Sequence, residues 1–208
     1  MVAQALARRA SVVVLAGRPS YNPAERHRPY LWRRDRQGEV MVERVGSTTF
    51  TRDRMPGRVC NYLSYLALAV PRALAADADV VLAMTDPPVG GVVGAFVAAV
   101  RRRRFVYNVR DLYPEMAVAS GLLHSRTIVA AWERLHRWVL RRADRVVVLG
   151  EDMWERIVAK GIPAGRVVVV RDGAPIPPTP PAADHRVVQE VRSGFPFVVL
   201  HAGSLGFY

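Results

Sequence analysis

Short apolar runs rich in valine alternate along the chain with longer stretches in which apolar residues recur every three or four positions. The short runs predict β-strands at 11–16, 39–45, 79–84, 105–109, 145–149 and 166–170. The longer stretches predict helices at 58–76, 90–101, 125–142 and 151–160. Most of the strands are apolar throughout, which is typical of parallel strands covered on both faces. The alternation therefore predicts an α/β fold with a doubly wound, Rossmann-like parallel sheet.

The helix predicted at 125–142 carries an apolar stripe, and arginines at 134, 137 and 141 lie on its other side. The stripe consists of Ile128, Trp132, Leu135, Trp138 and Val139. One interpretation is a core-facing stripe with a solvated opposite face. The alternative is an interfacial helix whose tryptophans and arginines lie against anionic lipid.

Prolines mark a boundary near the carboxyl end of the chain. Their density predicts a stiff, extended interdomain linker at 172–194. A Rossmann-like domain at 1–171 precedes it, and the strand and glycine turn at 195–208 are interpreted as the start of a second, donor-binding domain. A doubly wound domain normally opens with a strand and a glycine-rich turn. This chain opens in a helix, so the first strand is expected to be missing.

Composition adds a regional positive charge. The chain has 208 residues and a net charge of +12, and all of its basic residues except Lys160 are arginines. Segments 1–60 and 101–145 carry the excess, which fits an anionic partner or membrane surface; a solvated arginine-rich surface is the alternative. The single cysteine, Cys60, excludes a disulfide scaffold and is interpreted as a buried small residue.

Residues suited to chemistry follow the strand predicted at 105–109. In an open parallel sheet, ligands bind at the carboxyl ends of the strands. Arg110, Asp111 and Glu115 occupy this place. An acid beside an arginine can orient a hydroxyl or hold an anionic group. The alternative is that Asp111 caps the following helix and pairs with Arg110.

Other strand ends supply further candidates. Arg18 and Tyr21 follow the first strand, and Asp86 lies in a proline-rich loop after the strand at 79–84, where a purely structural role is the alternative. Backbone N–H groups of a last glycine turn could cradle a phosphate; its candidates are Gly203, Ser204 and Gly206. The histidines show no metal-ligand spacing, and His136 is interpreted as structural. Dinucleotide and P-loop signatures are missing, which disfavours oxidoreductases and NTPases.

Taken in order, these segments resemble the N-terminal domain of GT-B-fold, retaining family 4 glycosyltransferases, and within them the bacterial exopolysaccharide and O-antigen subgroup. The similar segments run collinearly over nearly the whole chain, at 4–7, 17–21, 61–65, 85–88, 110–115, 146–153, 156–163, 172–173 and 202–206.

The resemblance implies two Rossmann-like domains with the active site in the cleft between them. It implies transfer of a sugar from a nucleotide-diphosphate donor to a glycan or lipid-linked saccharide, with retention, in cell-surface polysaccharide biosynthesis. Neither a metal nor a further cofactor is expected. The implied catalytic residues are Asp111, Arg110 and Glu115; the implied acceptor-side residues are Arg18, Tyr21, Asp86 and Tyr113; and the implied donor-binding residues are Gly203, Ser204 and Gly206.

The chain also departs from the family pattern. The family's first strand and the basic and acidic donor-binding residues of its second domain are absent, Asp172 stands where relatives commonly have asparagine, and Ser204 replaces another asparagine. We therefore interpret the chain as a fragment that is inactive alone. The alternatives are a non-catalytic, membrane-associated or ligand-binding remnant and, from charge only, a nucleic-acid-binding protein. The expected location is the cytoplasm, including peripheral binding at the inner face of the plasma membrane, with no nucleic-acid partner.

Overall fold

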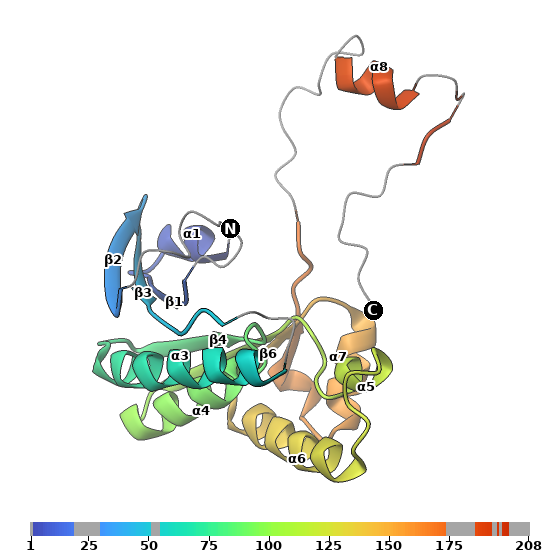
Figure 1. Cartoon of the computed structure of the whole chain (residues 1–208). Coiled ribbons are helices and arrows are strands. Elements are labelled where there is room, and N and C mark those ends of the chain that lie inside the picture. Colours follow the sequence, from blue (N-terminus) through green and yellow to red (C-terminus); the bar gives the residue numbers. More distant parts are fainter. Residues whose placement is uncertain are drawn as a thin grey trace.

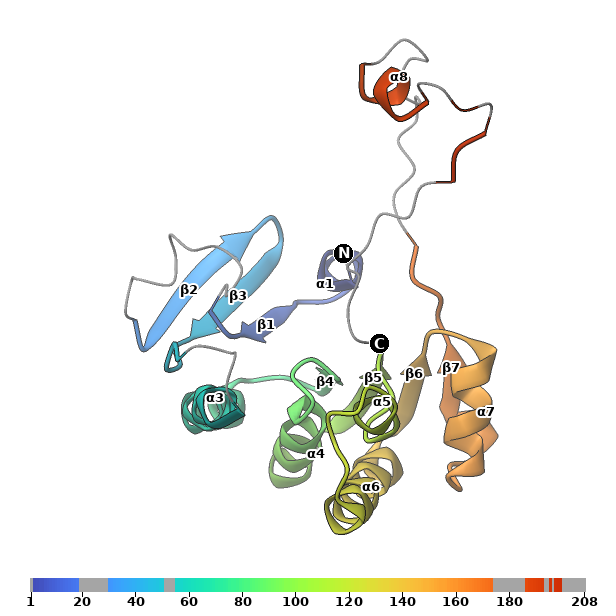
Figure 2. The ribbon, with the colours of Figure 1, turned by 45° about the vertical axis from the view of Figure 1, so that its right-hand side comes forward.

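The computed structural model describes residues 2–18, 30–50, 55–173 and 186–192, together with 195 and 197–199. The strands within these residues form two sheets, of order β1-β3-β2 and β4-β5-β6-β7 (Figures 1 and 2). The α/β class with a parallel sheet is confirmed. The prediction placed all strands in one sheet, whereas the described β1 and β4 are not paired with each other.

The smaller sheet contains a strand that the sequence pattern did not predict. β1 (Val13–Ala16) pairs in parallel with β3 (Val40–Val45), and β2 (Trp32–Gln37) pairs antiparallel with β3. β2 was not predicted because strands were identified by apolar runs, whereas β2 is a largely exposed edge strand with the charged sequence WRRDRQ. A two-residue turn joins β2 to β3, and Gly38 adopts a positive φ of 61° there, a conformation that favours glycine.

Helices cover both faces of this smaller sheet. α1 (Val2–Ala7) packs near β3 on one face, and α3 (Met55–Ala75) packs on the other. On the α3 side, the buried Glu43 accepts hydrogen bonds from Arg34 at 2.6 Å and Arg72 at 2.7 Å. Burial alone would raise the pKa of Glu43, but these hydrogen bonds outweigh it and hold the pKa below its ordinary value. The charged triplet thus ties β2, β3 and α3 together.

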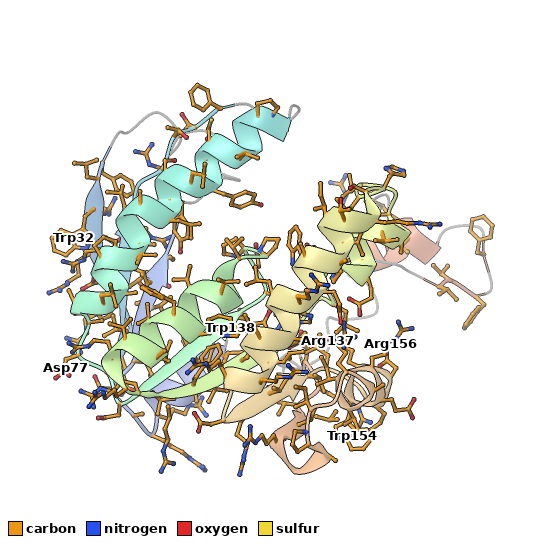
Figure 3. All side chains as sticks on the ribbon, turned by 90° about the horizontal axis from the view of Figure 1, so that it is seen from below. Trp32, Asp77, Arg137, Trp138, Trp154 and Arg156 are labelled. Atoms are coloured by element: carbon orange, nitrogen blue, oxygen red, sulfur yellow. The ribbon has the colours of Figure 1, made fainter. Side chains whose placement is uncertain are left out.

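The larger sheet is entirely parallel. Its strands are β4 (Val80–Met84), β5 (Arg104–Val109), β6 (Arg145–Val148) and β7 (Val167–Val169). They are connected by α4 (Gly90–Arg101), α5 (Glu115–Ala119), α6 (Arg126–Arg142), α7 (Glu151–Ala159) and a 3₁₀ turn (Ala164–Arg166). α3, α4 and α6 lie side by side along one face of the molecule (Figures 1 and 3). The six strands and four helices predicted over 11–170 are confirmed, with boundaries shifted by a few residues.

The core lies between the larger sheet and the helices α4, α6 and α7. Phe105 and Tyr107 on β5 are buried in it, together with Val139 and Leu140 of α6. A Cβ atom at Gly94 would lie 2.5 Å from the Cβ of Ala83, so only glycine lets α4 approach the strands this closely. The glycines at the start of α4 therefore serve packing.

α6 turns a different face inward than the sequence predicted. Ile128, Leu135 and Trp138 are exposed, although they belong to the predicted core stripe. Val139 of the predicted stripe is buried, and the other buried residues of this helix are His136 and Leu140, which the stripe did not include. The inward stripe is thus centred one position further along, because α6 packs against α4 with this side of its surface.

The prediction that Cys60 is buried is wrong, because its thiol is free and exposed on α3. The buried Ala69 of the same helix marks the inward face. The two residues are nine positions apart, about two and a half helical turns, which places them on opposite sides of α3.

Near the carboxyl end, α8 (Arg186–Arg192) lies inside the segment predicted to be an extended linker. The prolines at 175–181 all precede this helix. An ion pair of 2.7 Å between Arg186 and Glu190, which are four positions apart, stabilises the helix. The strand predicted within 195–208 is not formed at the described residues 197–199. The division into two domains stays a prediction. Within the described residues, no helix has the length and apolar character needed to cross a bilayer.

Candidate functional site

The carboxyl ends of the parallel strands bring several of the predicted site residues to one edge of the larger sheet. Thr85 and Asp86 follow β4, Arg110 and Asp111 follow β5, and Asp172 comes shortly after β7. Because parallel strands end on the same side, these residues share an edge, which is where ligands bind in open α/β sheets.

Thr85 fixes the turn that carries Arg110 and Asp111. Its buried hydroxyl oxygen accepts the backbone N–H of Arg110 at 3.1 Å and that of Asp111 at 3.2 Å. Both amides come directly after Val109, the last residue of β5. The residue that follows β4 therefore sets the backbone position of the two central candidates that follow β5.

Replacing Thr85 with valine should lower the free energy of unfolding by about 2 kcal/mol, because two partly buried N–H groups lose their acceptor while side-chain volume is kept. Urea unfolding measures this loss. Thr127→Val on the exposed side of α6 is the matched control and should change stability by less than about 0.5 kcal/mol. Equal losses in both variants would contradict this role of Thr85.

Arg110 pairs with Asp172 rather than with Asp111. Its guanidinium donates one hydrogen bond to Asp172 at 3.0 Å and a second, shorter one to the other carboxylate oxygen. The bond to Asp172 raises the pKa of Arg110, and the charge of Asp111 adds to this rise. α5 begins at Glu115 after Pro114 and has no side-chain cap, so the capping role considered for Asp111 is not found.

Tyr65 of α3 connects the end of β1 with the loop after β4. Its ring lies 3.4 Å from the position of a Cβ at Gly17. Burial raises the pKa of its phenol, and the nearby carboxylate of Asp86 raises it further. Tyr65 was not among the predicted site residues, although it belongs to the segment 61–65 that carried the resemblance.

Arg18 is the predicted site residue that follows β1 within the described residues. Arg18 donates a hydrogen bond to the backbone carbonyl of Tyr30 at 3.0 Å and stacks over its ring at 4.8 Å. Tyr21, Gly203, Ser204 and Gly206 lie outside the described residues.

Glu115 and Tyr113 contact the helices instead of Arg110. The Tyr113 ring stacks on Trp132 of α6, with centroids 5.7 Å apart. One carboxylate oxygen of Glu115 binds the ammonium of Lys160 at 2.5 Å, and the other is buried without a partner. The three residues predicted to be catalytic therefore separate into Arg110 and Asp111 at the sheet edge and Glu115 in a second cluster.

This second cluster centres on Lys160, whose side chain is 8% exposed at the end of α7. Its ammonium also binds Glu133 of α6 at 2.7 Å, and Glu133 accepts a further bond from Arg137 at 2.8 Å. Burial and the charge of Lys160 lower the pKa of the neighbouring His136 to about 4, so the imidazole is neutral near pH 7. Its two ring nitrogens have no hydrogen-bond partner.

A cavity of about 590 Å³ lies beside the cluster, between α5, α6 and α7. Arg137 and Arg156, both labelled in Figure 3, line it from α6 and α7. Glu115, Glu133 and His136 place potential metal-ligating atoms within 4.8 Å of one another. The ammonium of Lys160 already bridges the two carboxylates, and Arg137 adds a second positive charge at Glu133.

Comparison with known families gives one match. The family model described as the glycosyl transferase 4-like domain matches residues 1–173, which include both sheets and the edge that carries Arg110, Asp111 and Asp172. No curated protein matches the chain.

Proposed function

Because the chain belongs to the glycosyl transferase 4-like family, we propose that it is the acceptor-side part of a glycosyltransferase. In this proposal a sugar moves, with retention of configuration, from a nucleotide-diphosphate donor to a glycan or lipid-linked saccharide in cell-surface polysaccharide biosynthesis. The observation that carries the proposal is the gathering of Asp86, Arg110 and Asp111 at the carboxyl edge of the sheet inside the matched region.

In the proposal, Asp111 acts on the acceptor and Arg110 acts on the departing diphosphate of the donor. The carboxylate of Asp111 orients a hydroxyl of the acceptor, because a carboxylate accepts the hydroxyl proton in a hydrogen bond. Departure of the donor's diphosphate builds negative charge, which the guanidinium of Arg110 stabilises. Asp172 holds Arg110 in position through its paired hydrogen bonds. Asp86 and Arg18 contact the acceptor from the ends of β4 and β1.

The donor contacts in this proposal come from the glycine turn. Backbone N–H groups of Gly203, Ser204 and Gly206 bind the diphosphate, as such turns do where a helix follows. The nucleotide sugar is the co-substrate, and no metal enters the proposal. Glu115 keeps a structural role through Lys160.

Asp111→Ala should lower turnover about a hundredfold when the chain is joined to a donor-binding domain, because the acceptor hydroxyl loses its orienting carboxylate. Release of the nucleoside diphosphate measures turnover. Asp77→Ala is the matched control: Asp77 is exposed at the opposite edge of the sheet, before β4 (Figure 3). Equal rates for the two variants would remove Asp111 from the mechanism.

An anionic membrane is the proposed surface on which a lipid-linked acceptor is met, and this places the protein peripherally at the cytoplasmic face of the plasma membrane. The support is α6, where Ile128, Leu135 and Trp138 are exposed and Arg142 lies 5.7 Å from the Trp138 ring. This surface also fits the alternative of a membrane-associated remnant without catalysis.

Sedimentation with vesicles of phosphatidylglycerol and phosphatidylcholine tests the membrane surface. Arg134→Glu/Arg141→Glu should pellet several-fold less protein than the unchanged chain, because each reversal replaces attraction to the anionic lipid by repulsion. Arg33→Glu/Arg36→Glu on β2 is the control of equal charge. Equal pelleting of both double variants would contradict a specific role for α6.

A further inference from the structure

Glu133 and His136 are three positions apart on α6, so their side chains project from the same side of this helix. In helical metalloproteins, a Glu-x-x-His pair supplies two inward-facing ligands from one helix. Glu115 reaches the same place from α5, and one ligand atom from each of the three residues lies within 4.8 Å of the others. Two helices thus bring two carboxylates and an imidazole together.

The imidazole of His136 is buried in this cluster without a hydrogen bond. The residue is 5% exposed, and neither ring nitrogen has a hydrogen-bond partner among the described residues. One carboxylate oxygen of Glu115 is likewise buried and unpaired. Buried polar atoms in folded proteins are almost always paired, so two unpaired groups in one cluster point to a bound ligand.

The three groups are ligands that zinc and similar divalent transition metals prefer. Imidazole nitrogen and carboxylate oxygen bind Zn²⁺ at about 2.0 to 2.2 Å, with four ligands at the corners of a tetrahedron. The ligand atoms of one such ion are about 3.4 Å apart, so side-chain rotations that shorten the separations by about an ångström complete three corners. The cavity that Glu115 and Glu133 line leaves the fourth corner to water or a small ligand.

The ammonium of Lys160 lies between the carboxylates, where the metal ion would lie. It is 2.5 Å from Glu115 and 2.7 Å from Glu133, so the space between these carboxylates already holds a positive charge. Lys160 also lines the cavity, which has a volume of about 590 Å³. Its long, flexible side chain can rotate into that space, where water solvates the ammonium. The metal ion and the ammonium therefore compete for one position.

We propose that Glu115, Glu133 and His136 form a binding site for a divalent transition-metal ion of the zinc class, and that the ion displaces the ammonium of Lys160. The bound ion joins α5 to α6. The spacing of the histidines gave no sign of this site, because two of its three ligands are carboxylates and one of these lies on another helix. The cluster is separate from the sheet edge to which sugar transfer is assigned, so the proposal goes beyond the proposed function.

Calorimetric titration of the full chain with Zn²⁺, after treatment with a chelator, tests the proposal. One ion should bind per chain. His136→Gln should weaken this binding at least about tenfold, because it removes a ligand. His124→Gln, at an exposed histidine just before α6, is the matched control and should bind like the unchanged chain. Glu115→Gln, at a side chain that is 36% exposed, should also weaken binding and keeps the test decisive if His136→Gln fails to fold.

Lys160→Met tests the displacement. Because the competing ammonium is gone, this variant should bind Zn²⁺ at least about tenfold more tightly than the unchanged chain. Arg156→Met is the matched control, since it removes an equal charge from an exposed residue in the wall of the same cavity (Figure 3). It should change the affinity by less than about threefold at physiological salt, where exposed charges are screened.

Three outcomes would overturn the proposal. The first is no binding of Zn²⁺ at about 0.1 mM to either the unchanged chain or Lys160→Met. The second is binding that survives both His136→Gln and Glu115→Gln, which would assign the ion to another place on the chain. The third is an affinity of Lys160→Met no greater than that of the unchanged chain. None of these results depends on Asp111 or on turnover, so failure here leaves the proposed function intact.

Discussion

Replacing Lys160 with methionine is expected to lower the free energy of unfolding by about 3 kcal/mol at pH 7. The ammonium of Lys160 is the shared partner of Glu115 and Glu133, at 2.5 and 2.7 Å. Methionine matches the length of the side chain but removes its charge, so two partly buried carboxylates are left facing each other. Removing one partner from a buried ion pair is much more destabilising than the net value of the pair.

Two companion variants separate charge from packing at this position. Lys160→Arg keeps the positive charge and should retain most of the stability. Lys160→Met combined with Glu133→Gln removes both charges of one pair and should recover about half of the loss, because less negative charge remains uncompensated. Urea unfolding of the set gives the energies. A Lys160→Met variant as stable as the unchanged protein would show that the ion pairs contribute nothing.

The difference in free energy of unfolding between the unchanged protein and Lys160→Met (the stability gap) should depend on pH. The lowered pKa of Glu133 sets the direction of this dependence. Burial alone would raise its pKa, but the hydrogen bonds from Lys160 and Arg137 outweigh this effect and hold the pKa below its ordinary value. A lowered folded pKa gives stability that is present above the unfolded pKa and is lost as the pH falls through the folded one. The gap between the unchanged protein and Lys160→Met should therefore be full at pH 7 and shrink in acid.

His136 supplies an independent readout of the same substitution. Its pKa is lowered to about 4 by burial and then by the charge of Lys160, while Glu115 and Glu133 act in the opposite sense. Without the ammonium, the pKa of His136 should rise, and NMR titration measures it. The protonated imidazole would then stabilise the two carboxylates, so the gap should already narrow between pH 7 and 5.

Apolar periodicity was enough to predict the elements of the larger sheet, because each of its strands and helices buries a contiguous apolar pattern. It failed where burial does not decide the structure. β2 is charged and exposed, and its pairing with β3 comes from the tight turn at Gly38 and the Glu43 ion pairs. That β1 and β4 belong to separate sheets was also not predicted, because the sequence of a strand does not specify which strands it pairs with.

The sequence predicted where the site residues lie on the sheet, but it did not predict which residue pairs with Arg110. Arg110 and Asp111 stand at a strand end because the run 105–109 ends there, and that part of the prediction could be made from local sequence. The partner of Arg110 is Asp172, which is 62 residues away and reaches it only through sheet order. Lys160 gave one signal in the sequence, as the single lysine of an arginine-rich chain. Its ammonium lies between the carboxylates of Glu115 and Glu133, partners that the sequence pattern did not reveal.

Replacing Phe105 with alanine is expected to lower the free energy of unfolding by about 4 kcal/mol, a loss that brings a domain of ordinary stability near its unfolding threshold. Phe105 is 2% exposed, and its ring lies 6.0 Å from that of Tyr107. It also packs against Gly94, where α4 comes too close to the sheet to rearrange into the space. The space left by the Phe105 ring therefore stays empty as a cavity, because neighbouring groups cannot move in to fill it.

Phe96→Ala is the matched control for this substitution. Phe96 lies on the outer face of α4 and is 46% exposed, so its loss should change stability by less than about 1 kcal/mol. Urea unfolding compares the two variants, and equal losses would contradict the assignment of Phe105 to the core. Because Phe105 lies on β5, which Arg110 and Asp111 follow directly, the cavity should also loosen the sheet edge. Faster exchange of the Arg110 and Asp111 amides in Phe105→Ala, with no such change in Phe96→Ala, would connect core packing on β5 directly to the geometry of the candidate site.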